Sequence, residues 1–325
     1  MGNNNGQKGF IDEDAHYLND GNTISFGQDT ATIFYQEKPY FTGDKIKILK
    51  PKVKEFKKSN AQFFITSMNL AFSHFAWGSS SFNMNVLNNQ AIMLPVTPNG
   101  KIDFEFMETF VAELEAHRVA ELEAYLTVTG LKDYKLTEEE KETLENLSLF
   151  EWKEFNITEI FNIKNTKNIL SNQIKPNSGT VPYLCASAEN NSVSSYISYK
   201  EELKDKGNCI FIGGKTFVVS YQEFDFFSND SHNLALYLRN KEFANQINQL
   251  YLATCIKKSL RHKYSWGDSI SNKKIQKDKV MLPVKDGAVD YRIMARLISA
   301  VQKLVIKDLV IWADKKIEAT KQVVQ

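Results

Sequence analysis

One short stretch of this sequence looks able to hold a phosphate group, the tetrapeptide Gly-Gly-Lys-Thr at 213–216. It resembles the end of a phosphate-binding loop, but that motif needs a glycine at position 209, where a cysteine stands. The motif also needs a helix afterwards, whereas the residues that follow predict a strand. We therefore interpret the stretch as a tight turn between strands, in which Gly213 and the similarly placed Gly27 use the tolerance of glycine for positive φ.

The histidines and cysteines have no spacing typical of catalysis or metal binding. The histidines are His16, His74, His117, His232 and His262, and none has an obvious acid or metal partner in sequence. The three cysteines have no C-x-x-C pair, which argues against a structural zinc site and a disulfide scaffold, and Cys209 and Cys255 are predicted to be small core residues. A nuclease needs clustered carboxylates near a lysine, and Glu-Leu-Lys at 202–204 offers only a fragment. We expect no catalytic residue, no metal site and no cofactor.

Positive charge is concentrated near the end of a helix predicted over 241–262. Lys257, Lys258 and Arg261 crowd that end, and further lysines follow up to position 279. Such side chains can contact DNA phosphates, which gives salt-dependent affinity without sequence information. The alternative is a solvated helix C-terminus, where the helix macrodipole favours cations.

Asparagines form a second group of candidates, because an asparagine side chain can pair with both N6 and N7 of adenine. The alternative is that these asparagines form turns. The predicted DNA-contacting residues are Asn4, Asn5, Lys8, Asn190, Asn191, Lys257, Lys258, Arg261, Lys263, Lys273 and Lys274.

The composition is that of a folded protein with near-neutral charge. The chain has 325 residues, 42% of them hydrophobic and 24% charged, which is enough for roughly two domains. Lysine and arginine number 40 against 39 acidic residues, so a charged partner must meet a local patch. The N-terminus is rich in Asn and Gly, and no apolar run approaches the roughly 20 residues that span a bilayer. We predict a cytoplasmic protein.

An internal repeat organises the chain. The segment at 21–27 and its Tyr-Gln-Glu continuation at 35–37 recur at 207–213 and 221–223, 186 residues later. Met-Leu-Pro-Val at 93–96 recurs identically at 281–284, 188 residues later. The near-constant offset indicates two copies of one domain.

A tryptophan occupies equivalent positions in the two copies. Trp77 and Trp266 each stand before a glycine in similar tetrapeptides. We interpret both as core or turn anchors, with base stacking as the alternative.

Each Met-Leu-Pro-Val is followed by a turn signal and then by a long helix-period stretch, near 104–126 and 293–317. Gly130 ends the first helix, and Thr137 and Glu140 form a capping box that opens a new domain. Strands are expected within 23–35 and 208–220. The residues expected to pack the long helices are Met107, Phe110, Leu114, Leu122, Ile293, Leu297, Val301 and Leu304.

The ordered duplication of domain, long helix, domain and long helix resembles the specificity (S) subunit of Type I restriction-modification systems and the related target-recognition subunits of BcgI-like Type II systems. The resemblance covers essentially the whole chain, and 152–163 looks like the opening of a target-recognition domain. It implies that each globular domain reads one half of a split DNA site and that methyltransferase subunits dock beside the domains. The family carries no catalytic residues of its own.

The implied fold class is α+β, with two repeated α/β target-recognition domains separated by two long antiparallel coiled-coil helices. We assign 1–100 to a first, N-terminally incomplete recognition domain and 101–135 to the first spacer helix. The second recognition domain spans 136–285 and the second spacer helix 286–325. A helix of about 24 residues is about 36 Å long, close to one DNA turn between half-sites.

We therefore predict a non-catalytic subunit that recognises a bipartite sequence in double-stranded DNA and directs methyltransferase and restriction subunits. Because the first copy has no equivalent of 150–163, specificity is expected mainly in 136–285. One alternative is a structural adaptor that docks partners through its paired helices without binding DNA, and another is a divergent nuclease.

Overall fold

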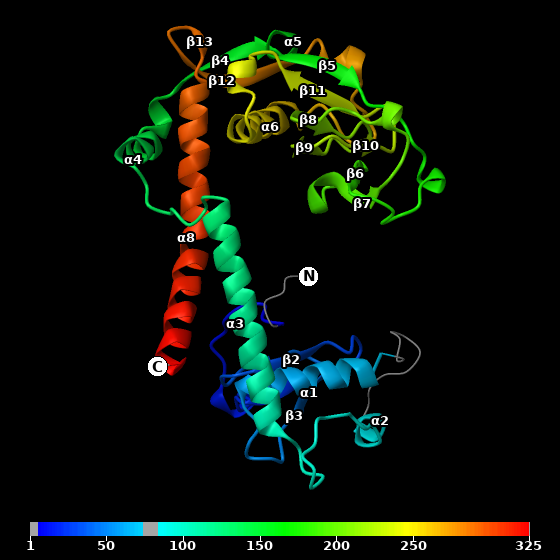
Figure 1. Cartoon of the computed structure of the whole chain (residues 1–325), viewed down its shortest axis with the longest axis vertical. Coiled ribbons are helices and arrows are strands. Elements are labelled where there is room, and N and C mark those ends of the chain that lie inside the picture. The colour runs from blue at the N-terminus through cyan, green and yellow to red at the C-terminus, as the bar shows by residue number, and fades with distance from the viewer. Residues whose placement is uncertain (1–5, 74–83, 325) are drawn as a thin grey trace. The chain divides into compact units, whose positions relative to one another are not determined.

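The computed structural model describes residues 6–73 and 84–324 (Figure 1). The chain divides into two compact units. Unit 1 comprises Met1–Tyr125 and Trp312–Gln325, and unit 2 comprises Leu126–Ile311. Each unit mixes helices and strands, as the sequence predicts.

Unit 1 is built on a small antiparallel sheet with the order β2-β1-β3. Its strands are β1 (Thr23–Gly27), β2 (Ile33–Gln36) and β3 (Ile46–Leu49). The helix α1 (Lys58–Ala71) covers the sheet, and the apolar side chains of Ile24, Phe26 and Ile65 are buried between them. The short helices are η1 (Ala15–Tyr17) and α2 (Met84–Asn88). The predicted strand region at 23–35 is thus the hairpin β1–β2.

Unit 2 has a four-stranded sheet at its centre, with the order β5-β11-β8-β9. Its strands are β5 (Phe161–Asn165), β8 (Cys209–Ile212), β9 (Val219–Gln222) and β11 (Leu234–Leu238). The helix α6 (Gln246–Leu260) packs on this sheet, where Leu252, Ile256 and Leu260 are completely buried with Ile210 and Leu236. The predicted helix over 241–262 is therefore confirmed in its central part.

Two further sheets complete unit 2. One has the order β10-β6-β7, and the other has the order β13-β12-β4. Their strands are β4 (Glu151–Asn156), β6 (Val181–Leu184), β7 (Val193–Ile197), β10 (Phe227–Ser228), β12 (Lys279–Lys285) and β13 (Ala288–Val289). The short helices are α4 (Glu138–Glu145), η2 (Leu147–Leu149), α5 (Ile157–Ile160), η3 (Ser171–Gln173), η4 (Asn190–Ser192), η5 (Glu201–Leu203), η6 (Lys241–Phe243) and α7 (Asn272–Ile275).

The two long helices are α3 (Phe104–Val128) and α8 (Tyr291–Val324). Thr137 and Glu140 form the predicted capping box at the start of α4, and Gly130 has the positive φ of 71° expected after a helix end. Within the described residues, no helix combines the length and the apolar character needed to cross a membrane.

The duplication extends to individual hydrogen bonds. Tyr35 donates to the side chain of Asn22 at 3.0 Å, and Tyr221 donates to that of Asn208 at 3.2 Å. Both asparagines have positive φ, 52° and 50°, which asparagine tolerates better than most residues. The repeat detected in the sequence is therefore a repeat in structure.

The predicted backbone role of the turn glycines is wrong. Neither Gly27 nor Gly213 has positive φ, and the left-handed residues of the two turns are Ala31 and Phe217. Glycine is needed for space, because a Cβ at Gly213 would lie 2.6 Å from that of Ala186 and a Cβ at Gly27 would lie 2.6 Å from two threonine hydroxyls.

Candidate nucleic-acid interface

The predicted cationic cluster lies at the end of α6 and in the loop and helix that follow. Lys257, Lys258, Arg261 and Lys273 are exposed, and among the described residues none has an ion-pair partner. Lys274 instead pairs with Asp268 at 2.6 Å. The four unpaired cations have their charge available for a phosphate.

Lys263 belongs to a fixed part of this cluster. Its ammonium lies 2.9 Å from Asp278, whose side chain is only 6% exposed. Tyr264 also donates to Asp278, at 2.5 Å, and burial raises the pKa of this tyrosine above its ordinary value, so it stays protonated. The contacts of Lys263 and Tyr264 with Asp278 hold the end of α6 against the residues that follow α7.

The predicted asparagines occupy turns, or lie where the structure gives no description. Asn4 and Asn5 fall outside the described residues, while Lys8 is exposed. Asn190 and Asn191 have φ of 46° and 51°, and their amides donate to backbone carbonyls at 3.0 Å and 2.9 Å. These two amide nitrogens are engaged in holding the turn before β7.

A basic groove of about 830 Å³, absent from the sequence prediction, opens along β5. Its cations come from three separate segments of the chain, and its one carboxylate is Asp205. The cations are Lys164, Lys167, Lys204, Lys206, Arg239 and Lys241. No linear motif could reveal it, since the antiparallel pairing of β5 with β11 places Phe161 opposite Leu238 and so brings Arg239 and Lys241, which follow β11, to the edge of the groove along β5.

Some groove cations are anchored and others are available. Lys167 donates to the carbonyls of Glu202 and Lys204 at 2.6 Å and 3.0 Å, and Arg239 donates through Nε to Thr158 at 2.8 Å. Burial raises the pKa of Asp205 above its ordinary value, which weakens its opposing charge as the pH falls. Lys204 is ion-paired with Glu201 and Lys206 with Asp225. Among the described residues, Lys241 has no ion-pair partner, so its charge is available to a ligand.

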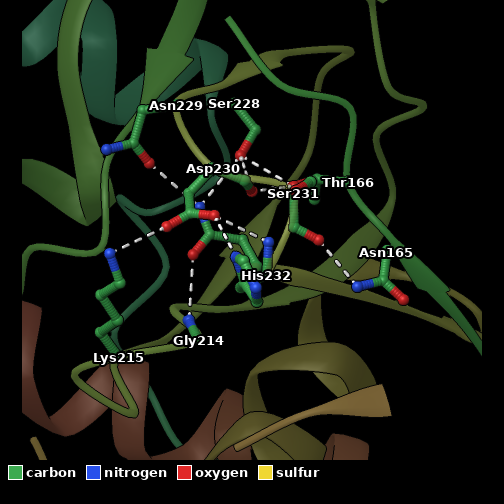
Figure 2. Close-up of polar contacts among 10 residues, drawn as sticks. Asn165, Thr166, Gly214, Lys215, Ser228, Asn229, Asp230, Ser231 and His232 are labelled. Carbon is green, nitrogen blue, oxygen red and sulfur yellow. Dashed lines mark hydrogen bonds and ion pairs between the residues drawn. The ribbon is translucent and has the colours of Figure 1, made fainter. Parts of the chain in front are cut away.

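A smaller cleft of about 270 Å³ opens beside the turn that resembled a phosphate loop. Figure 2 shows the polar contacts around Asp230, at its edge. Asp230 accepts hydrogen bonds from the backbone and ring nitrogens of His232 at 2.9 Å and 2.7 Å, and lies 3.5 Å from the Lys215 ammonium. Burial would raise the pKa of Asp230, but these contacts outweigh it and hold the pKa below its ordinary value. Asp230 is therefore a carboxylate at neutral pH.

Buried Asn233 ties together the loops that form this cleft. Its side-chain oxygen accepts from the Gly214 amide at 2.9 Å, and its amide donates to Ser228 at 3.0 Å and to the oxygen of Asn229 at 3.1 Å. The turn between β8 and β9 is thereby fixed to the loop after β10.

The predicted core role of Trp266 is wrong. The tryptophan lies in a turn, as expected, but its side chain is 82% exposed at the rim of the cleft. The equivalent Trp77 falls outside the described residues.

The long helices are only partly buried along the predicted faces. Met107 is fully buried, and Leu122, Ile293 and Leu297 are half-buried. The more exposed members of the predicted set are Phe110, Leu114, Val301 and Leu304. In unit 1 α8 contacts α3 through an ion pair between Lys316 and Glu115, and in unit 2 α8 contacts α4 through Lys303 and Glu140 at 3.0 Å.

The cysteines predicted to be core residues are confirmed as such. Cys209 and Cys255 are buried, and burial raises the pKa of each thiol to about 12, so the reactive thiolate is disfavoured at neutral pH. Within the part of the chain that is described, no three metal-ligating side chains converge.

Comparisons with known proteins identify the family and the fold. The family described as Type I restriction modification DNA specificity domain matches residues 1–124 and 150–308. The chain is 25% identical over 308 residues to the Type II restriction enzyme specificity subunit S.BcgI of Heyndrickxia coagulans. This match covers 93% of this chain and 84% of that protein. The fold is similar, with a TM-score of 0.55 and 16% identity, to the S subunit of a Type I restriction-modification system from M. genitalium, over 94% of this chain and 81% of that one. The chain therefore belongs to the family of Type I restriction modification DNA specificity domains.

Proposed function

We propose that this chain is the DNA-recognition subunit of a restriction-modification complex and performs no catalytic step itself. The observation that carries this proposal is the basic groove of unit 2, where six cations and one carboxylate line an open surface of a protein with a net charge of only +1. Cations arranged along a groove supply phosphate contacts to a nucleic acid. The family membership supports DNA as that nucleic acid.

Each copy of the repeat serves one half of a split site in double-stranded DNA. We assign recognition to 1–100 and 136–285, and spacing to the helical segments 101–135 and 286–325 packed antiparallel as a coiled coil. The length of α3 supports a spacer role, because its 25 residues span about 38 Å at 1.5 Å per residue. This is close to one turn of DNA.

The partners of the chain follow from the same proposal. The relative from Heyndrickxia coagulans is named as the specificity subunit of a restriction enzyme, which supports partner subunits that carry the chemistry. We expect methyltransferase subunits and a restriction subunit, assembled in the cytoplasm. The comparisons offer no support for an adaptor that does not bind DNA.

The test is a map of modified bases in the host genome, with the gene intact and then disrupted. We expect methylation to disappear at one split motif and to return when the gene is restored. An unchanged map in a strain that expresses the protein would contradict the proposal. The spacer length of the lost motif would also test the helix-length argument.

A further inference from the structure

We propose that the cleft beside the β8–β9 turn contacts a guanine, and that Lys215, Asn229 and Trp266 determine this preference. The inference rests on the proposed function and goes further by assigning a base to specific side chains. It follows from which hydrogen-bonding atoms line the cleft and which of them are already occupied.

The cleft offers hydrogen-bond donors. The Asn229 oxygen accepts from Asn233, while its amide nitrogen points away from the loop in Figure 2 and has no partner among the described residues. The Lys215 side chain is 66% exposed, and its one ion-pair partner, Asp230, lies at 3.5 Å, beyond a normal hydrogen-bond length. Asp230 accepts both hydrogen bonds from His232 through Oδ1, and its Oδ2 faces the Lys215 ammonium.

The two donors, the Lys215 ammonium and the Asn229 amide nitrogen, match the edge of guanine better than that of other bases. In the major groove guanine presents two acceptors, N7 and O6, whereas adenine and cytosine each present an amino group that would face these donors. Thymine presents one acceptor beside a methyl group. The Asn229 oxygen already accepts a hydrogen bond from Asn233, so the part of this side chain without a partner in the described structure is its amide nitrogen, which is a donor.

Trp266 is placed to pack against the same nucleotide or its neighbour. The turn that carries it is closed by reciprocal backbone hydrogen bonds between Ser265 and Asp268, and Asp268 is paired with Lys274. The Ile270 amide donates to the Gly214 carbonyl at 3.1 Å, which fixes this loop to the lysine-bearing turn. An indole held in solvent on a fixed turn loses little conformational entropy when it binds, and base–aromatic contacts add affinity.

The experiment uses the full chain with the subunits that co-purify with it. Selection from a randomised duplex library gives the preferred motif, and 7-deazaguanine, which lacks the N7 acceptor, then replaces each guanine in turn. At one guanine we expect the substitution to lower the affinity of the unaltered protein at least about fivefold. The penalty for 7-deazaguanine should vanish in at least one of the two cleft variants, Lys215→Ala and Asn229→Asp, namely the one that has lost the donor to N7. Asn229→Asp keeps the oxygen that accepts from Asn233.

The control variants separate this contact from a general loss of binding. Trp266→Ala should lower affinity for the motif at least about fivefold, while Phe224→Ala, which truncates another exposed aromatic of unit 2, and Lys200→Ala should leave it unchanged. A motif without guanine, or a penalty for 7-deazaguanine that persists in both cleft variants, would overturn the guanine assignment alone. If the unaltered protein selects no motif, the proposed function fails and the inference with it.

Discussion

The individual cations of this protein differ in whether they are already ion-paired or are available to bind a phosphate. Lys263 is held by buried Asp278, whereas Lys257, Lys258 and Arg261 are exposed without an ion-pair partner in the described part of the chain. If these three contact phosphates, replacing them together with alanine should weaken binding to all sequences alike. The slope of log K against log salt should fall in magnitude by about 0.9 for each phosphate that the variant no longer neutralises. Titrations of duplex DNA at several salt concentrations measure this slope, with Lys200→Ala as the control. A variant with an unchanged slope would show that these side chains do not touch phosphate.

The long helices begin in the same way in both copies. Asp103 caps α3 by accepting from the Phe106 amide at 2.9 Å, and Asp290 caps α8 by accepting from the Ile293 amide at 3.0 Å. The backbone amide of each aspartate also donates to the proline carbonyl of the preceding Met-Leu-Pro-Val segment, at 2.9 Å for Asp103 and 3.0 Å for Asp290. Asp103→Ala and Asp290→Ala should each lower the free energy of unfolding by about 1 kcal/mol, because each leaves helix amides unsatisfied. Urea denaturation followed by circular dichroism measures the loss. Asp308→Ala, at an exposed position within α8, should cost nothing, and an equal loss there would argue against capping.

For the whole molecule, the duplication predicts that specificity is modular. The exchange of 136–285 for the corresponding segment of a related subunit should change one half of the methylated motif and leave the other half as it was. The reason is that the basic groove along β5 and the cleft beside the β8–β9 turn both lie within this segment. The modified-base map of a strain that carries the chimera is the measurement, and a chimera with the helices exchanged instead should alter only the spacer between the half-sites. An unchanged motif after the domain exchange would remove recognition from this segment.

The features predicted correctly from the sequence are those that depend on nearby residues. Helix periodicity, the capping box of Thr137 and Glu140, and the turn at Gly130 involve residues a few positions apart, so their physical cause is visible in the linear order. The duplication is visible for the same reason, because it repeats local patterns at a constant offset.

The surface that we propose to bind DNA was decided by the tertiary structure. The pairing of β5 with β11 assembles the groove from cations that are tens of residues apart, and no periodicity records which strands will be neighbours. Packing also explains why position 213 requires a glycine, because Ala186 from another loop leaves no room for a Cβ there. Tryptophan is a large apolar residue of the kind expected in a core, but the path of its turn leaves the side chain of Trp266 in solvent. Local order thus determined the elements and their repetition, while contacts distant in sequence determined which side chains line the groove and the cleft.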